Sequence, residues 1–324
     1  MHTNLWFWII FNAGVLSVLA IDLFAFQQKA HRPSMKEAAI WTLIWVLLSL
    51  GFGSLVWFLM GPGKAVEFLT GYLVEYSLSV DNIFVFALIF SYFAVPAAYQ
   101  HRVLFWGILS ALVLRGIMIG AGAAFVQTFH WALYFFGAFL LITGAKLLFN
   151  RKKVVDIARN PVIRLVRSWI SVSDSYHGAH FTIRRDGRRI LTPLAMVLIM
   201  VEITDVLFAV DSIPAIFGIT HDPFIIYTSN VCAVLGLRSL YFLVAGIVHR
   251  FVYLKPALAI ILSFIGTKML LADVLHIPTA AALGFIGSVL LTATILSLLI
   301  KHRHADAQPV LEPEHDSETV SNPQ

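Results

Sequence analysis

Two short stretches of the sequence decide the fold, EYSLSVDNI at residues 75–83 and DVLFAVDSI at residues 205–213. Both begin with an acidic residue and continue with five mostly apolar or small residues that end in Val. Each then reads Asp, a small polar residue and Ile. Each stretch lies within a long apolar segment, so acidic residues recur where charge is expensive to bury.

The similarity between the two stretches continues along the chain. One apolar segment later each copy has a lone arginine, Arg115 or Arg238, and after one more segment a glycine-flanked lysine, Lys146 or Lys268. The spacing from Arg to Lys is 31 residues in the first copy and 30 in the second. Because order, residue type and spacing all recur, we predict an internal repeat.

The composition is that of a membrane protein. Of the 324 residues, 59% are hydrophobic and 13% are charged, and the mean hydropathy is +0.83, whereas soluble domains have about 25% charged residues. The sole cysteine, Cys232, rules out an intramolecular disulfide and any CxxC motif. It is expected to be a small buried hydrophobic residue.

Nine segments are long and apolar enough to span a bilayer, which takes about 20 residues. They are residues 5–26, 38–60, 66–94, 103–126, 131–149, 192–218, 224–248, 254–273 and 279–300. We therefore predict an all-α polytopic membrane protein with nine transmembrane helices, in which helices 3–5 and 6–8 form two three-helix repeat units. Because three is odd, the second unit must enter the membrane in the opposite direction, which is a transporter architecture.

The predicted helices divide the chain into six parts. They are an N-terminal two-helix segment (1–65), the first repeat (66–149), a basic loop (150–191), the second repeat (192–275), a C-terminal helix (276–302) and a disordered tail (303–324). Within the loop, residues 181–191 are predicted to form a hairpin, because Asp186-Gly187 suits a type I′ turn.

The basic residues predict the orientation of the chain. With nine spans, 18 of the 23 Lys and Arg residues fall on one side, Lys64 alone falls on the other, and four lie inside helices. The positive-inside rule then places the N-terminus in the periplasm and the C-terminus in the cytoplasm of a bacterial inner membrane. Topology and anionic lipid account for the basic loop, so we expect no nucleic-acid partner.

Charges inside the predicted helices point to a cation path. Each would cost about 2.5–3.5 kcal/mol at the bilayer centre, and nine unpaired groups would cost on the order of 25 kcal/mol, more than the net stability of a typical fold. They must therefore face one another or water. The acidic residues exceed the basic ones by one, which favours a cation.

The candidate ligands are oxygen donors. The predicted metal-binding residues are Glu75, Asp81, Asn82, Glu202, Asp205, Asp211 and Ser212, with Arg115, Arg238, Lys146 and Lys268 as counter-charges. Such oxygen ligands suit Mg²⁺, Ca²⁺ or Mn²⁺. Alternative interpretations are structural salt bridges and a proton relay. Asp22 is either a gate residue or part of a capped helix end.

These acids can meet at one site only if their helices deviate from regular geometry. Residues six apart lie about 240° apart around a regular helix, so the two acids of each stretch face different ways. We therefore predict that each helix is interrupted near its Val-Asp pair. Pro214 would cause the break in the second copy, and a milder break is expected at residues 79–82 in the first.

Three motifs carry a family resemblance. They are FLTGYLVEYSLSVDNIFVF (68–86), VEITDVLFAVDSIPAIF (201–217) and DPFIIYTSNVCAVLGLRSLYFLVAG (222–246). From about Ala20 to His302 the chain resembles the TerC family of integral membrane proteins, and within it the Alx branch. The resemblance implies nine helices, a relation to LysE-type exporters, and an association with tellurite resistance and manganese export. It also implies that the family's acidic residues correspond to the five acids named above.

These observations predict a transporter that exports a divalent cation, with manganese as the first choice, through a buried carboxylate site and by proton exchange. No permanently bound cofactor and no enzyme activity are expected; the bilayer and the transported cation are the expected partners, and the oligomeric state is left open. Two alternatives remain: a non-transporting membrane scaffold or redox-stress component linked to tellurite resistance, and a transporter of protons or calcium.

Overall fold

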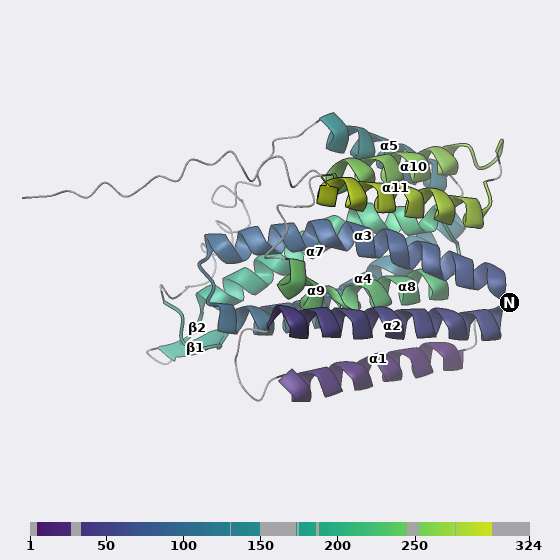
Figure 1. The fold of residues 1–324 in the computed structure, drawn as a ribbon. Coiled ribbons are helices and arrows are strands. Elements are labelled where there is room, and N and C mark those ends of the chain that lie inside the picture. Colours follow the sequence, from purple (N-terminus) through teal and green to yellow (C-terminus); the bar gives the residue numbers. More distant parts are fainter. Residues whose placement is uncertain are drawn as a thin grey trace, which may run out of the picture.

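The computed structural model describes residues 5–26, 34–129, 131–149, 173, 175–185, 188–244, 253–275 and 277–299. In this part of the chain the fold is a bundle of helices with one small hairpin (Figure 1). The helices are α1 (Leu5–Phe26), α2 (Met35–Met60), α3 (Pro62–Tyr92), α4 (Ala97–Thr128), α5 (Ala132–Phe149), α7 (Pro193–Phe217), α8 (Pro223–Leu235), α9 (Leu237–Val244), α10 (Leu254–Leu270) and α11 (Thr279–Leu299). The predicted tail, 303–324, lies outside the described residues.

Each of the nine predicted apolar segments contains helix, so the all-α polytopic class is confirmed. In the described part of the chain, α2, α3, α4, α7 and α11 are long and apolar enough to cross a membrane by themselves. The pair α8–α9 adds a sixth candidate span if the two helices are taken together, and α1 and α5 are shorter apolar helices.

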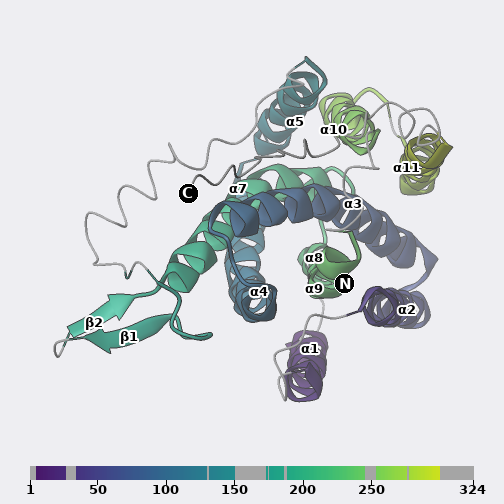
Figure 2. The same cartoon turned by 60° about the vertical axis from the view of Figure 1, so that its left-hand side comes forward.

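Helices α3 and α7 lie at the centre of the bundle and run in opposite directions (Figures 1 and 2). Figure 2 shows α1, α2, α4 and the α8–α9 pair on one side of them, and α5, α10 and α11 on the other. Helix α3 packs against α8, and α4 packs against α7. Thus the first two helices of each predicted repeat contact helices of the other repeat.

Helices α5 and α10 approach closely through their glycines. A Cβ atom at Gly144 would lie 2.8 Å from the carbonyl oxygen of Ala259, and one at Gly266 would lie 2.7 Å from that of Gly137. Gly144 lies two residues before Lys146, and Gly266 lies two residues before Lys268. The carbonyls that they face, at Ala259 and Gly137, each lie nine residues before the lysine of the same helix. The two contacts are therefore equivalent by position in the two predicted repeats.

The predicted helix breaks are wrong. Helix α3 is continuous through residues 79–82, and α7 is continuous through Asp211 and Pro214. Pro214 lies three residues before the end of α7, so the helix ends soon after the proline, which removes only the N–H partner of the Val210 carbonyl. Residues 79–82 contain no proline or glycine. The interruption lies instead at Gly236, where α8 and α9 meet at 42°, directly before the turn that carries Arg238.

The predicted hairpin is confirmed. Strands β1 (Thr182–Arg185) and β2 (Arg188–Leu191) pair antiparallel, while the turn residues 186–187 lie outside the described residues. Thr192 follows β2 and caps α7, since its hydroxyl accepts from Ala195 N at 3.4 Å. We call the end of the bundle that carries β1 and β2 the hairpin end. The end at which α3 and α8 begin is called the opposite end.

Candidate ion-binding site

Arg115 is the centre of a buried polar network that joins four helices. Its side chain is 1% exposed, and it donates to Asp205 on α7 through two parallel bonds, Nε to Oδ2 at 3.1 Å and Nη2 to Oδ1 at 2.8 Å. Nη1 pairs with Glu75 on α3 and donates to Oδ1 of Asn230 on α8 at 3.1 Å. A bidentate guanidinium–carboxylate pair is among the stronger polar contacts in proteins.

Small residues bring α8 close enough for Asn230 to reach the network. A Cβ atom at Gly71, one turn before Glu75 on α3, would lie 2.8 Å from Oγ of Ser229. The missing side chain lets the two helices approach, and Asn230 follows directly after this contact. Glu75, Asp205 and Asn230 are all at most 4% exposed, so water contributes little to holding their charges and dipoles.

Some polar atoms of the network have no hydrogen-bond partner among the described residues. They are Oε2 of Glu75, Nδ2 of Asn230 and, one turn along α3 from Glu75, Oγ of Ser79. Buried polar atoms are normally paired, and each exception needs an explanation. Two of the three are oxygens on one face of α3, because residues four apart share a face. These two oxygen atoms are of a kind that can coordinate a cation.

Glu202 lies one turn before Asp205 and forms a second contact between α7 and α4. Its Oε1 accepts from the hydroxyl of Ser110, and its Oε2 is buried without a hydrogen-bond partner in the described part of the chain. A cavity of about 20 Å³ lies beside Asp205 and is lined otherwise by apolar residues and Gly107. This volume suffices for about one water molecule.

Three of the other predicted ligands, Asn82, Asp211 and Ser212, have no contact with Arg115 among the described residues. Asn82 and Ser212 are buried, and Asp211, six residues after Asp205, is half-buried and is not among the partners of Arg115 in the described structure. Asp22 lies in α1 and Asp81 in α3, but the placement of both side chains falls outside the described part. The structure thus brings together Glu75, Asp205 and Arg115, with Glu202 one turn away.

The remaining predicted counter-charges are spread over the bundle. Arg238 is buried in the first turn of α9, whereas Lys146 is exposed near the end of α5. Lys268 lines a cavity of about 250 Å³ with His221, near the opposite end. Burial lowers the pKa of His221, which lies in the connection between α7 and α8. Within the described chain, neither lysine is a hydrogen-bond or ion-pair partner of Glu75 or Asp205.

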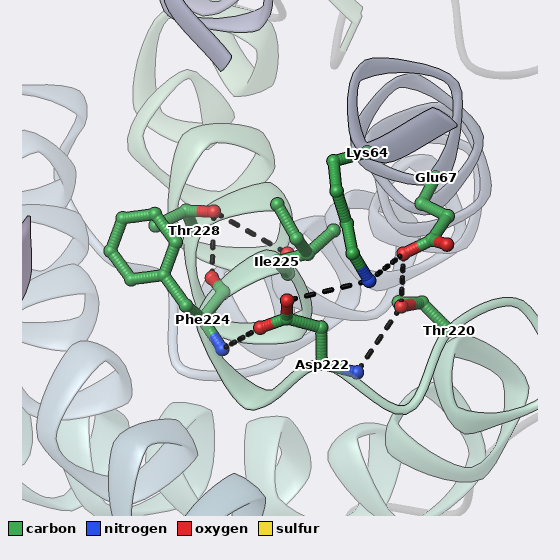
Figure 3. Close-up of polar contacts among 7 residues, drawn as sticks. All are labelled: Lys64, Glu67, Thr220, Asp222, Phe224, Ile225 and Thr228. Carbon is green, nitrogen blue, oxygen red and sulfur yellow. Dashed lines mark hydrogen bonds and ion pairs between the residues drawn. The ribbon is translucent and has the colours of Figure 1, made fainter. Parts of the chain in front are cut away.

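A second polar cluster ties the two predicted repeats together at the opposite end (Figure 3). Lys64 of α3 contacts both Glu67, at 2.8 Å, and Asp222, at 3.4 Å. Thr220 donates its hydroxyl hydrogen to Oε2 of Glu67 at 2.5 Å. Asp222 also caps α8 by accepting from the N–H of Phe224 at 3.1 Å. This cluster therefore links the start of α3 to the connection between α7 and α8.

Several of these residues were missed by sequence reasoning. Asn230, Ser110 and Glu67 were not predicted as site residues, although Asn230 stands in one of the three quoted motifs, residues 222–246. Among the described residues, no three or more His, Cys, Asp or Glu side chains are grouped so as to hold a metal ion. The metal-binding role of the predicted ligands thus stays a prediction.

Known proteins resemble the chain along most of its length. The profile of the "Integral membrane protein TerC family" matches residues 60–305. An uncharacterized membrane protein of Myxococcus xanthus is 52% identical over 298 residues, covering 92% of this chain and 93% of the relative. The Alx protein of Escherichia coli K12, whose name assigns it provisionally as a membrane-bound redox modulator, is 47% identical over 306 residues, covering 92% and 95%. No solved structure matches. With the family profile covering more than two thirds of a helical, apolar chain, this protein belongs to the TerC family of integral membrane proteins.

Proposed function

We propose that the chain is a secondary transporter that exports a divalent cation, with manganese as the favoured ion, from the cytoplasm to the periplasm in exchange for protons. The observation that supports it best is the buried network of Glu75, Arg115 and Asp205. Two carboxylates and one guanidinium leave one excess negative charge, deep between helices that belong to both predicted repeats.

The charges of the network favour a divalent ion. When Arg115 is withdrawn, Glu75 and Asp205 together carry two negative charges, which one divalent cation neutralises and one monovalent cation does not. Arg115 then acts as a tethered counter-ion that holds the empty site together. Removing one partner from a buried ion pair typically costs about 3–5 kcal/mol, so release of Arg115 must be coupled to arrival of the cargo.

Glu202 is the proposed acceptor for the released guanidinium. It lies on the same face of α7 as Asp205, three residues earlier, and its Oε2 has no hydrogen-bond partner in the described structure. Its contact with Ser110 already places it against α4, the helix of Arg115. If Arg115 moved from Asp205 to Glu202 when the cation binds, its guanidinium would be paired with a carboxylate both before and after binding.

The proposal includes nine spans and an inverted repeat. It is supported by the antiparallel course of α3 and α7 and by the equivalent glycine contacts of α5 and α10. In transporters built this way, the site lies where the two repeats meet and one repeat rocks against the other. The Lys64–Glu67–Asp222 cluster would then close the opposite end, which is periplasmic in the proposed orientation.

The choice of manganese rests on what the family resemblance implies. Carboxylate, amide and hydroxyl oxygens are ligands for hard cations in general and separate Mn²⁺ poorly from Mg²⁺. Crystals soaked in a manganese salt would test the assignment directly, because anomalous scattering between α3 and α7 would locate the ion at Glu75 and Asp205. Anomalous peaks confined to other places would contradict it.

Flux measurements test the function itself. Purified protein in proteoliposomes should move Mn²⁺ down an imposed gradient, and Glu75→Gln or Asp205→Asn should reduce that flux at least tenfold, since each leaves the site one carboxylate short. Asp273→Asn is the matched control, because Asp273 is exposed and contacts Tyr134 rather than the network. Wild-type flux in either site variant would overturn the site assignment.

The name of the Escherichia coli relative favours a second candidate, redox modulation. Redox modulation can be tested at Cys232, the sole cysteine of the sequence. This residue is 8% exposed and lines an apolar cavity bounded by α1, α2 and α8. On the transport proposal, Cys232→Ser keeps full flux and full protection of cells against manganese load. Loss of protection with unchanged flux would instead favour the redox role.

A further inference from the structure

We propose that the arginine-rich hairpin of β1 and β2 binds, through Arg184 and Arg189, the phosphate groups of anionic phospholipids at the membrane surface. The inference does not depend on what the protein transports. It starts from the strand register, which sets Arg184 opposite Arg189 and Arg185 opposite Arg188. Four arginines thus form two cross-strand pairs of like charge in one ten-residue hairpin.

An anion would stabilise such a register. Residues directly opposite each other on antiparallel strands have Cβ atoms about 4.5–5.5 Å apart, and like charges in this position destabilise the sheet. Arg184 and Arg189 are exposed, and within the described residues no ion pair joins either to an acidic side chain. Asp186, between the strands, lies outside the described part. A phosphate between the two guanidinium groups would turn repulsion into bidentate binding.

The position of the hairpin selects a lipid as the source of that phosphate. Strand β2 ends at Leu191, and the apolar helix α7 begins at Pro193, so the base of the hairpin lies at the membrane boundary. Figure 2 shows the hairpin projecting from the end of α7, away from the other helices of the bundle. A basic hairpin that begins at this level lies next to lipid headgroups, whose anionic surface attracts arginine.

Contacts at its base connect the hairpin to the helices of the buried network. Thr192 donates its hydroxyl hydrogen to the carbonyl of His180 at 2.7 Å, and Tyr176 donates to the carbonyl of Phe93, after α3, at 2.7 Å. The guanidinium of Arg102, on α4, lies 5.4 Å from the ring centre of Phe181. The segment therefore touches α4, α7 and the end of α3, so a bound lipid would restrain all three.

The binding is testable on the full chain in nanodiscs. A Thr182→Cys variant on a Cys232→Ser background carries an environment-sensitive fluorophore at the base of the hairpin. We expect a blue shift that grows with the fraction of phosphatidylglycerol in phosphatidylcholine discs and falls with added salt, because exposed charges are screened. Inorganic phosphate added to neutral discs should not reproduce the shift.

Two sets of charge removals make the test specific. Replacing the four hairpin arginines by glutamine should abolish most of the shift, whereas Arg164→Gln with Arg167→Gln, in the same loop but outside the hairpin, should leave most of it. Unchanged melting of both variants in neutral discs would show that folding is intact. A shift that is equal in neutral and anionic discs, or lost equally in both sets, would overturn the proposal.

Discussion

At the scale of single residues, Arg115 is the side chain on which the centre of the bundle depends. It supplies the only positive charge that Glu75 and Asp205 contact in the described structure. Insertion into a bilayer already makes each charge costly. Loss of the arginine would leave two carboxylates facing one another without compensation, so its removal affects stability before it affects any transport step.

We expect Arg115→Met to destabilise the protein by about 3–5 kcal/mol, the usual cost of breaking a buried ion pair. Adding Glu75→Gln should recover part of this loss, because the double variant removes one of the two uncompensated charges. Thermal melting in detergent measures both effects, with Lys36→Met as an exposed control. A melting temperature for Arg115→Met equal to that of the wild type would contradict the central role of the network.

The sequence predicted the charged members of this site better than its neutral ones. Glu75, Asp205 and Arg115 were identifiable because charge in an apolar segment demands a partner. Asn230 and Ser110 have no such signal, since single polar residues are common in membrane helices. Spacing did not predict either which of the acids meet at one site, because that depends on where the helices bend.

At the scale of elements, the lengths of the apolar segments predicted the helices within a few residues at most ends. This succeeded because a bilayer fixes the length of apolar helix that must be buried. The interruptions were mispredicted because Pro214 marks the last turn of α7, whereas the bend depends on Gly236, which lies against Trp45 of α2. Tertiary packing, which the sequence does not display, decides between the two.

The close packing of α5 and α10 predicts that a larger residue at their contact lowers stability. Gly266→Ala should cost about 1–3 kcal/mol, as overpacking usually does, because its new Cβ would lie 2.7 Å from a backbone carbonyl. Gly14→Ala, in α1, is the matched control, since nothing lies within 4 Å of a Cβ at that position. Equal melting temperatures for the two variants would contradict the close packing of α5 and α10.

At the scale of the whole molecule, the distribution of Lys and Arg predicts which way the chain faces. A phosphatase reporter that is active only in the periplasm should be inactive when fused after His302 and active when fused after Gly63, between α2 and α3. Enzyme activity in intact cells, normalised to the amount of fusion protein, measures this. Activity of both fusions, or of neither, would require a different number of spans.

The interlocking of the two halves has a consequence for how the protein is made. Asp205 follows Arg115 by 90 residues and Asn230 follows it by 115, so α4 leaves the ribosome well before its partners exist. At about 5–20 residues per second, the delay before Asp205 is synthesised is roughly 5–20 s. Of the partners that Arg115 contacts in the described structure, the nascent chain can offer only Glu75 during that interval, and the insertion machinery or water must satisfy the rest of its hydrogen-bonding capacity. Biogenesis, rather than the finished bundle, is therefore the stage at which this chain is most exposed to misassembly and to quality-control proteases.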